Sequence, residues 1–568
     1  MDLELLFSEQ HTLNDTIMKS FYWIAIVIAF MSIAHRGYAQ MSISYPMDRA
    51  VFQRCEWGGS RASFYVAGQC MLGNQQYALQ MKITELFATN GSTKSVYQDW
   101  TTFVSSTPFG GLFKRYVQLP GGLFNIEVRA AVGAVSYATA NVRVGVGEVY
   151  LIAGQSNAQG ATNTSALSQS PYEGVVSDLY FSDCSDEIPT YPSLMPIWYG
   201  YPIATQGATN WCYPKLGNNI VDQTGVPVAF FNGAQSGTHV GNWTESMYGG
   251  GTLNLNNDTQ FICQKPGQPY TAFRNIMNFY GSLFGTRGVL WHQGETDSQR
   301  STTTADYQTK LTDLINKARS DFGQPSLGWY VSKATYDYAF RNFDGHNGDP
   351  TWQDVVTAQT SVANANRQGP STDNVGIPRA DGRVHFGGTQ LADLANAWSN
   401  SNITIGTPIC ANQMPDLEVT KNPDGSYTLT GDSSPQYTSW MWVNDNNRPV
   451  GGNVIHNGRV YSNVTSSNSY RYYAKTAEGN YVVSQRVTLP LPAGTARMAV
   501  SVLEKAENYG SQLKLSPNPV VEQLIVEHTI PDDRDVQIDV VNQQGQRVGV
   551  AVGNKQRISP GKYAVDVG

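Results

Sequence analysis

The chain has 568 residues, a length that indicates several domains rather than one. Its composition is 41% apolar with 31 Tyr and 12 Trp, which supplies enough apolar side chains for sizeable cores. Charged residues make up only 15% and the net charge is -7, so no basic surface for nucleic acid or an anionic membrane is indicated.

The N-terminal segment has the order of a secretory signal. Lys19 precedes an apolar run at 21–34, and small residues follow at 37 and 39. This run is shorter than the roughly 20 residues that a membrane-spanning helix needs. Residues 1–17 contain four acidic residues and no Lys or Arg, which does not suit the start of a signal peptide. We therefore expect translation to start at Met18. We expect 18–39 to be a signal peptide whose cleavage leaves no stable membrane span, the alternative being an anchor that stays attached.

Residues 41–145 have the pattern of a small antiparallel β-sandwich. Short β-forming runs occur at 63–66, 77–81, 115–119 and 124–128, and Pro-Gly-Gly separates the last two as a turn. The pattern does not decide between a supporting role and ligand binding.

From residue 146 to 402, strands alternate with helices, which implies a parallel sheet and an α/β domain. We expect strands at 149–153, 226–231, 288–291 and 327–331. Apolar residues at helical spacing predict helices over 307–318 and 391–398, the second of which closes the domain. An irregular segment at 180–215 is rich in Tyr, Pro and Trp. It either shapes a binding site or packs on the domain surface.

Two further β-rich units follow. Residues 411–490 contain strand-forming runs at 426–430, 439–443 and 470–474, whose length and pattern suit an immunoglobulin-like sandwich. A polar linker separates this unit from a last β-rich unit at 511–568.

Six cysteines are few for this length, and none forms a Cys-x-x-Cys pair, which argues against zinc or iron-sulfur binding. Export permits disulfides. The pairs we expect are Cys55 with Cys70 and Cys184 with Cys212.

Ser156, in Gly-Gln-Ser-Asn, is the candidate nucleophile. It directly follows the apolar run 149–153, and open α/β sheets bind their ligands at the carboxyl ends of such strands. The preceding Gly154 permits a tight turn that a Cβ would obstruct. A serine placed there needs a base and an oxyanion hole to attack an ester.

His385 is the candidate base, with Asp381 close by in sequence. A carboxylate can orient the imidazole ring and stabilise the imidazolium that forms when the serine loses its proton. The alternative is a solvated loop histidine beside an incidental aspartate.

The candidate oxyanion donors follow two further strands. Gly237 could present a backbone N–H without obstruction, and Gln293 could donate from its side-chain amide. Both could instead be ordinary turn residues. Because strand ends of one sheet lie together, we expect both near Ser156, with His385 facing them.

Gly-Gln-Ser-Asn, the Gly-Thr segment before Trp243, Trp-His-Gln-Gly-Glu-Thr-Asp at 291–297 and the late Asp…His-Phe together resemble the SGNH hydrolases. Within them, the closest branch is the sialate O-acetylesterase-like and acetylxylan-esterase-like carbohydrate esterases. The resemblance covers about 146–402. It implies a three-layer α/β/α fold and ester hydrolysis without a metal or other cofactor. It also implies Ser156 as nucleophile, His385 as base, and Gly237 and Gln293 with the Ser156 N–H as the oxyanion hole.

One spacing departs from this family. Its members usually have two residues between Asp and His, whereas three separate Asp381 from His385. Asp381 reaches the ring only through a wider turn; otherwise Asp373 or a backbone carbonyl orients His385. We favour Asp381, and we assign Glu295 and Asp297 to loop geometry rather than proton transfer.

The last unit, 511–568, also resembles a family. Leu-Ser-Pro-Asn-Pro-Val at 515–520, Gly-Gln-Arg-Val at 545–548 and Pro-Gly-Lys-Tyr at 560–563 are similar to the C-terminal sorting domain of type IX secretion in Bacteroidetes. The resemblance implies a Gram-negative host, the type IX secretion machinery as partner, and release from the cell or attachment to its surface. An ordinary β-domain is the alternative.

Together these features predict a secreted serine esterase that removes O-acetyl groups from carbohydrate. One alternative is a lipase or aryl esterase, although its Gly-x-Ser-x-Gly elbow fails here because residue 158 is Ala. Another is a glycan-binding or adhesion protein without catalysis. No phosphate-binding loop or His-Glu-x-x-His motif is present, so we expect neither nucleotide nor metal.

Overall fold

The computed structural model describes residues 40–491 with internal gaps, and six strands between 514 and 566. The gaps are 73–75, 108, 163, 166–169, 183–187, 198–200, 255–256, 262–264, 335–352, 367–376, 382–383 and 446–453. The expected signal peptide 18–39, the cysteines at 184 and 263, and Asp373 lie outside the described residues.

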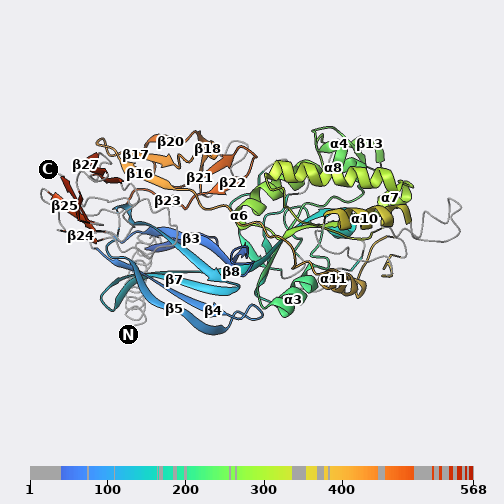
Figure 1. The fold of residues 1–568 in the computed structure, drawn as a ribbon, viewed down its shortest axis with the longest axis horizontal. Helices are drawn as coiled ribbons and strands as arrows, with labels where there is room; N and C mark the ends of the chain where they lie inside the picture. The colour runs from blue at the N-terminus through green and yellow to red at the C-terminus, as the bar shows by residue number, and fades with distance from the viewer. Residues whose placement is uncertain are drawn as a thin grey trace, which may run out of the picture.

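The N-terminal unit consists of two β-sheets packed face to face (Figure 1). One sheet has the order β1 (Met41–Tyr45), β3 (Arg61–Cys70), β6 (Leu112–Pro120). The other contains β5 (Thr93–Val104), β4 (Ala78–Leu86), β7 (Gly122–Val132) and the first part of β8 (Val135–Gly154), with β2 (Ala50–Gln53) parallel to β8. Alternate residues of these strands meet in one apolar core, where the rings of Phe52 and Phe64 stack at 4.5 Å.

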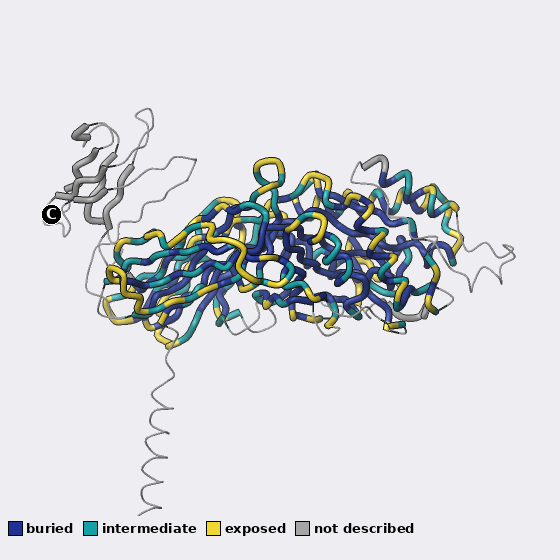
Figure 2. The backbone as a smooth tube through the Cα atoms, turned by 90° about the horizontal axis from the view of Figure 1, so that it is seen from below, coloured by how far each residue is buried: buried dark blue, intermediate teal, exposed yellow. Residues whose placement is uncertain are grey.

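Strand β8 joins the N-terminal unit to the α/β unit without a break. Over residues 135–146 it pairs antiparallel with β7, and from Glu148 onward it pairs in parallel with β11 (Val228–Asn232) and β14 (Gly288–His292). The sequence pattern changes near 146, but the backbone does not turn there. The two units therefore share one sheet, and Figure 2 shows buried segments along the whole elongated body.

The α/β unit has a parallel sheet in the order β9 (Val175–Asp178), β11, β8, β14, β15 (Trp329–Val331), and β10 (Leu194–Pro196) adds an antiparallel edge. All four strands predicted in this region are confirmed. Three of them begin within two residues of the predicted position, whereas β8 begins much earlier. The residues of β8, β11 and β14 are buried on both faces, which explains their near-continuous apolar sequence.

Helices cover both faces of this sheet. α3 (Tyr213–Thr224) and α11 (Gln390–Asn400) share a core with Tyr150 and Ile152 of β8. α5 (Tyr270–Ile276), α8 (Thr304–Phe322) and α10 (Gln353–Asn366) share another with the alternate β8 residues Val149 and Leu151. The helical stripes predicted over 307–318 and 391–398 are confirmed as α8 and α11. Further short elements before residue 403 are α6 (Ser282–Phe284), β12 (Leu253–Asn254), β13 (Asn257–Phe261) and the helical turns η1 (Phe109–Gly111) and η3 (Met277–Gly281).

A second pair of sheets follows the α/β unit. It consists of β16 (Leu417–Lys421), β17 (Tyr427–Gly431) and β20 (Val460–Val464) opposite β19 (Val454–Asn457), β18 (Tyr437–Asn444), β21 (Ser469–Thr476), β22 (Tyr481–Val483) and β23 (Val487–Thr488). Trp442 and Tyr472 fill its core. It contacts both preceding units, for example through Gln69 with Thr488 and Asn480 with Phe322.

The C-terminal strands form two small antiparallel sheets: β24 (Lys514–Ser516), β25 (Gln523–Glu527), β29 (Lys562–Asp566) and β28 (Arg557–Ser559) in one, and β26 (Gln537–Val541) with β27 (Arg547–Val552) in the other. The expectation of a β-rich unit at 511–568 is met by these strands.

A disulfide connects two distant segments of the described chain. Cys55 bonds to Cys410, which ties the N-terminal unit to the chain leaving the α/β unit. The predicted pair Cys55–Cys70 is wrong, because β3 separates the two positions by roughly 30 Å of extended chain, whereas a disulfide needs Cα atoms about 5–6 Å apart. The pair Cys184–Cys212 is wrong as well, since Cys212, like Cys70, is a buried free thiol.

A buried carboxylate holds the point where the two halves of β8 meet. Glu148 is fully buried, and its oxygens lie 2.7 Å from Arg54 Nε and 2.7 Å from Arg287 Nε. Gln53 Nε2 donates a further hydrogen bond at 3.0 Å. The cluster links β2, β8 and the start of β14.

We expect Glu148→Gln to lower the free energy of unfolding by about 3–5 kcal/mol, because it leaves the 5% exposed Arg287 without its counter-charge. Urea unfolding followed by tryptophan fluorescence measures this. Glu85→Gln is the matched control: Glu85 pairs with the half-exposed Lys94, so its loss costs at most about 1 kcal/mol. Equal effects of the two substitutions would contradict the prediction.

Candidate active site

Ser156 lies directly beyond the carboxyl end of β8, as the first residue of the short helix α2 (Ser156–Gln159). Gly154 has φ +131°, and a Cβ there would collide with the backbone oxygen of His292 on β14. The Gln155 N–H then donates to that same oxygen at 2.9 Å. Glycine at this position permits the close approach of the two strands. Ser156 then lies at the carboxyl end of the sheet, where it is only 4% exposed.

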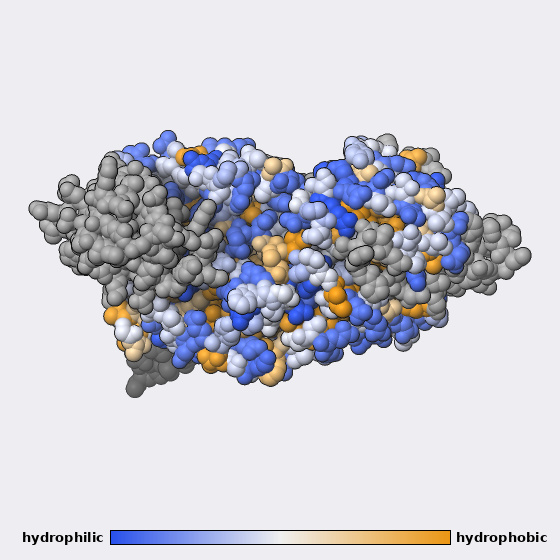
Figure 3. Space-filling model, viewed as in Figure 1, coloured by the Kyte–Doolittle hydropathy of each residue, from blue (hydrophilic) through white to orange (hydrophobic). Residues whose placement is uncertain are grey.

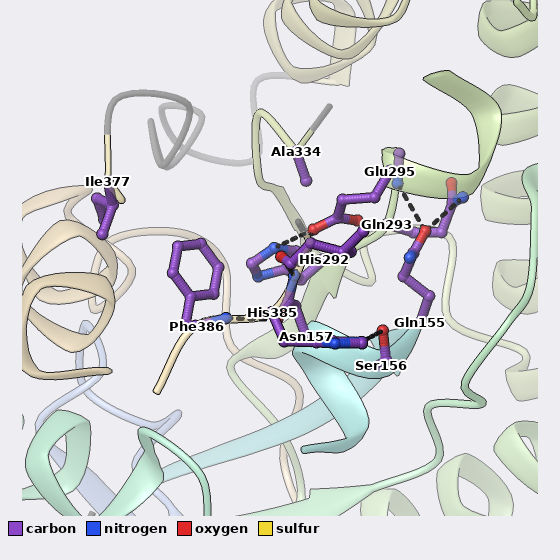
Figure 4. A network of polar contacts seen from close by, with 12 residues as sticks. Gln155, Ser156, Asn157, His292, Gln293, Glu295, Ala334, Ile377, His385 and Phe386 are labelled. Atoms are coloured by element: carbon purple, nitrogen blue, oxygen red, sulfur yellow. Dashed lines mark hydrogen bonds and ion pairs between the residues drawn. The ribbon is translucent and has the colours of Figure 1, made fainter. Parts of the chain in front are cut away.

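The structure brings His385 to Ser156 (Figure 4). Asp381 contacts the other nitrogen of the His385 ring. His385 Nε2 lies 2.9 Å from Ser156 Oγ, and His385 Nδ1 lies 2.8 Å from Asp381 Oδ2. With Nδ1–H donating to the carboxylate, Nε2 is free to accept the serine proton. The three side chains thus form a connected line from hydroxyl to imidazole to carboxylate.

The wider Asp381–His385 spacing closes through a turn held by the aspartate itself. Asp381 Oδ1 accepts hydrogen bonds from the N–H groups of Val384 and His385 at 2.9 and 3.0 Å, while Oδ2 faces the ring. The Ala380 N–H also donates to the His385 carbonyl. One carboxylate therefore fixes both the loop backbone and the imidazole.

Asn157 connects the turn at Ser156 to the loop that carries His385. Its Nδ2 donates to the Val384 carbonyl at 3.0 Å and to Glu295 Oε1 at 2.7 Å, and its Oδ1 accepts from the Phe386 N–H at 3.4 Å. Asn157 thus hydrogen-bonds to both sequence neighbours of His385, Val384 and Phe386. Asn157 stands in the motif that identified Ser156, but its contacts run to residues more than 100 positions away, so no local pattern revealed them.

Gly237 lies in the loop between β11 and α4 (Val240–Ser246), at φ +72°. Two hydrogen bonds dock this loop beside the nucleophile turn: Gln235 N–H to the Gly154 carbonyl, and Ser236 N–H to Gln159 Oε1. Within the described residues, the N–H groups of Ser156 and Gly237 donate to no protein acceptor. Both N–H groups are therefore available to a ligand.

Gln293 is fully buried behind this loop. Its Nε2 lies 2.6 Å from Asp297 Oδ2, 3.1 Å from Gln155 Oε1 and 3.2 Å from the Thr238 carbonyl, and its Oε1 accepts from the Tyr307 hydroxyl. An amide has two N–H donors, and protein acceptors surround both. In this geometry Gln293 holds the loop that carries Gly237, while its expected role as an oxyanion donor stays a prediction.

Two buried carboxylates of α7 (Glu295–Gln299) have opposite pKa shifts. Burial raises the pKa of Glu295, but the hydrogen bond and charge of His292, the charge of Arg379 and the amide of Asn157 outweigh it and hold the pKa near 2. Burial dominates at Asp297 and raises its pKa to about 6, although Val240, Gln293 and Thr302 donate to it. Both carboxylates contact protein groups that position the site, in agreement with the loop role expected for them.

The depressed pKa of Glu295 predicts a pH-dependent contribution to stability. A carboxyl whose pKa falls from 4.5 to about 2 on folding stabilises the fold by about 3 kcal/mol above pH 4.5, and this contribution disappears as the pH falls toward 2. Glu295→Gln should therefore destabilise the protein strongly at pH 7 and progressively less below pH 4.5. Thermal midpoints at both ends of this range measure the difference; a pH-independent effect would contradict the expectation.

Within the described ranges, no cluster of three or more His, Cys, Asp or Glu side chains has the arrangement of a metal site. No helix in the same ranges is both long and apolar enough to cross a membrane.

Residues 209–403, about a third of the chain, match the family described as carbohydrate esterase, sialic acid-specific acetylesterase. The matched region contains Gly237, Gln293, Asp381 and His385, and it begins after Ser156. This match supports esterase activity on carbohydrates. No curated protein sequence matches the chain.

Several solved structures are similar to this chain. A carbohydrate acetylesterase from Xanthomonas citri has 16% identity and a TM-score of 0.37, covering 80% of this chain and 98% of its own. A protein from Arabidopsis thaliana has 13% identity and a TM-score of 0.31 over 45% of this chain and 98% of its own. An aryl esterase of M. smegmatis has 10% identity and a TM-score of 0.26 over 44% of this chain and 97% of its own. Overlaps this weak establish no common activity.

Proposed function

We propose that this protein is an exported serine esterase of the SGNH type that hydrolyses O-acetyl esters on carbohydrates. The observation that carries the proposal is the continuous contact from Ser156 Oγ to His385 Nε2 and from His385 Nδ1 to Asp381. It stands at the carboxyl ends of parallel strands, where α/β sheets bind ligands. The helices on both faces of the sheet suit the three-layer fold of that class.

In the first half of the proposed reaction, Ser156 Oγ attacks the acetyl carbonyl carbon while His385 Nε2 takes the hydroxyl proton. The carbonyl electron pair moves to oxygen, and the backbone N–H groups of Ser156 and Gly237 stabilise the resulting oxyanion. The C–O bond to the sugar then breaks, and His385 returns the proton to the departing sugar oxygen. Ser156 is left acetylated and the carbohydrate hydroxyl is free.

Water completes the cycle by the same steps. The water oxygen adds to the acetyl carbon while His385 takes a proton from the water. The tetrahedral intermediate then collapses with release of Ser156 Oγ. The histidine proton passes to Ser156, and acetic acid leaves. Asp381 keeps the imidazole oriented throughout and stabilises its charged form.

Labelling of the nucleophile and release of acetate test this function together. An organophosphate that reacts with activated serines should modify Ser156, identified by mass spectrometry of the peptide, and should stop hydrolysis of an aryl acetate. Acetate release from acetylated xylan, pectin and sialic acid conjugates then identifies the preferred glycan. Modification of another residue, with Ser156 unlabelled, would overturn the mechanism. Faster turnover of long-chain acyl esters would favour a lipase instead.

Export and surface attachment are part of the proposal. They are supported by the signal-like order of 18–39 and by the sorting-domain motifs between 515 and 563. We expect the full chain in the medium or on the cell surface of its host. A chain without 511–568 should remain inside the outer membrane, as fractionation and immunoblotting would show. Equal distribution of both chains would contradict the role of the type IX machinery.

A further inference from the structure

The side chain of Gln155, the residue before Ser156, has a fixed orientation. Its Oε1 accepts hydrogen bonds from the backbone N–H groups of Gly294 at 3.3 Å and Thr296 at 3.2 Å. A backbone N–H can only donate, so the amide oxygen must face this turn and the NH₂ group must point away from it. The amide cannot flip without placing its own donors against two others.

A second amide reinforces this orientation. Gln293 Nε2 lies 3.1 Å from Gln155 Oε1, and the same nitrogen faces Asp297 Oδ2 at 2.6 Å and the Thr238 carbonyl at 3.2 Å. Gln293 Oε1 in turn accepts from the Tyr307 hydroxyl at 2.9 Å. Protein acceptors therefore surround the NH₂ of Gln293, whereas three donors converge on Gln155 Oε1. Hydrogen bonds to an amide oxygen polarise the amide and strengthen its N–H groups as donors.

The NH₂ group of Gln155 is not used by the protein. Within the described residues, its Nε2 makes no hydrogen bond, although the residue is only 2% exposed. The nitrogen is not sealed off, because it does not belong to the enclosed polar atoms without partners in the described part of the chain. A donor held in this way is satisfied by solvent in the free protein and can bond to an acceptor of a bound ligand.

The Gln155 amide is a neighbour of the loop that carries Gly237. Gln293 Nε2 lies between the Gln155 oxygen and the carbonyl of Thr238, the residue after Gly237. The Gln235 N–H of the same loop donates to the Gly154 carbonyl. The loop is thus docked on both sides of Gln155 along the chain, through its backbone partner Gly154 and through its side-chain partner Gln293.

This donor lies beside the candidate nucleophile and away from the base. Figure 4 shows the side chains of Gln155 and His385 on different sides of Ser156. In ester cleavage His385 must return its proton to the departing oxygen, so that oxygen faces His385. The carbonyl oxygen then points away from His385, toward the side on which Gln155 lies.

We propose that Gln155 Nε2 is a catalytic donor of the oxyanion hole, which stabilises the carbonyl oxygen together with the N–H groups of Ser156 and Gly237. The role rests on the proposed esterase function. No covalent bond to Gln155 forms: the hydrogen bond from Nε2 strengthens as the carbonyl electron pair moves to oxygen, and it weakens when the intermediate collapses. Gln293 then acts through Gln155 as a positioning residue and is not itself the donor that the family resemblance implies.

Gln155→Glu separates the donor from the fixed orientation. Glutamate keeps an oxygen for the N–H groups of Gly294 and Thr296 but replaces the NH₂ by a second oxygen. A small aryl acetate is the probe, since the described surface in the view of Figure 3 mixes hydrophilic and apolar residues and has no broad apolar face for a long acyl chain. We expect kcat to fall about 10²–10³-fold with KM within about threefold, the loss typical of one oxyanion donor.

Gln155→Met has a similar length and lacks donor and acceptor alike. Its kcat should fall by the same factor as in Gln155→Glu, while its thermal midpoint should fall further, because the N–H groups of Gly294 and Thr296 lose their acceptor. The donor thus determines kcat and the acceptor determines stability. A purely structural role would instead leave Gln155→Glu active and Gln155→Met inactive.

Binding of trifluoroacetone gives an independent readout. Ser156 Oγ adds to its carbonyl carbon and passes its proton to His385, which leaves an anionic oxygen where the ester oxyanion would be. Gln155→Glu should weaken this adduct by the same factor as kcat/KM, as fluorine NMR measures. Gln80→Glu on β4 is the matched control, because Gln80 Oε1 accepts from Arg129 within the N-terminal unit and the change there should alter neither quantity.

A kcat of Gln155→Glu within about threefold of the unaltered chain would overturn the role of Gln155 and leave Gln293 as the side-chain donor. A kcat that follows the thermal midpoint across the two variants would overturn it as well. Failure of the unaltered chain to hydrolyse any acetate ester would contradict the esterase proposal itself, and this role with it. The activity of the unaltered chain therefore distinguishes the two failures.

Discussion

Ser156→Ala should reduce the hydrolysis rate of an aryl acetate by about 10⁶-fold, to a level set by the remaining site geometry. The substitution removes the hydroxyl that lies 2.9 Å from His385 Nε2 and that the proposed mechanism uses as nucleophile. The protein should remain folded, because the lost hydroxyl makes no other side-chain hydrogen bond among the described residues. Stopped-flow measurement should also show loss of the acetyl-enzyme burst.

Ser298→Ala is the matched control for this experiment. Ser298 is a second fully buried serine, located on α7 only a few residues after Gln293, and its hydroxyl contacts no catalytic group. Its variant should keep the rate within about twofold, because Ser298 Oγ makes no hydrogen bond among the described residues and its removal leaves no partner unsatisfied. Comparable losses in both variants would show that packing, and not nucleophilic attack, explains the effect at Ser156.

Asp381→Asn should lower kcat by about 10⁴-fold with little change in KM. The backbone N–H groups of Val384 and His385 require an acceptor at Oδ1, so the new amide must turn its oxygen to them and its NH₂ to the ring. Nδ1 then has to accept, which leaves the proton on Nε2. That tautomer cannot take the proton from Ser156.

The fold should survive this substitution, because the turn from 381 to 385 keeps both backbone hydrogen bonds. Asp393→Asn on the exposed side of α11 serves as the control and should be neutral. The kcat and KM of each variant, measured across a pH range, separate a tautomer effect from a binding effect. A kcat within tenfold of the unaltered protein would show that another group orients His385.

Short-range patterns were sufficient for the elements that place the site. An apolar run followed by Gly-Gln-Ser predicted the strand end at Ser156, and the runs at 226–231 and 288–291 predicted its two parallel neighbours β11 and β14. These predictions succeeded because alternation, burial and turn chemistry act over a few residues. Ser156, His385 and Asp381 could also be named from sequence, although their contact could not be measured from it.

Other features depended on residues that meet only in the folded chain. The resemblance suggested Gln293 as an oxyanion donor, but the amide lies among Asp297 of α7, Gln155 before α2 and Thr238 before α4, which come from three different segments of the chain. The disulfide was mispaired because spacing along the chain says nothing of which strands face one another. The boundary predicted near residue 146 falls inside the single strand β8, whose partners change there from antiparallel to parallel.

The sequence by itself determined the strand and helix types, the place of Ser156 at a strand end and the candidate residues around it, since each of these depends on local patterns of side chains. Only the tertiary structure decided that Asp381 reaches His385 across a wider turn, that Asn157 holds the histidine loop, and that Cys55 meets Cys410. The physical reason is that each of these contacts joins residues that are separated along the chain. Its geometry therefore depends on how whole strands and helices pack and not on a residue's sequence neighbours.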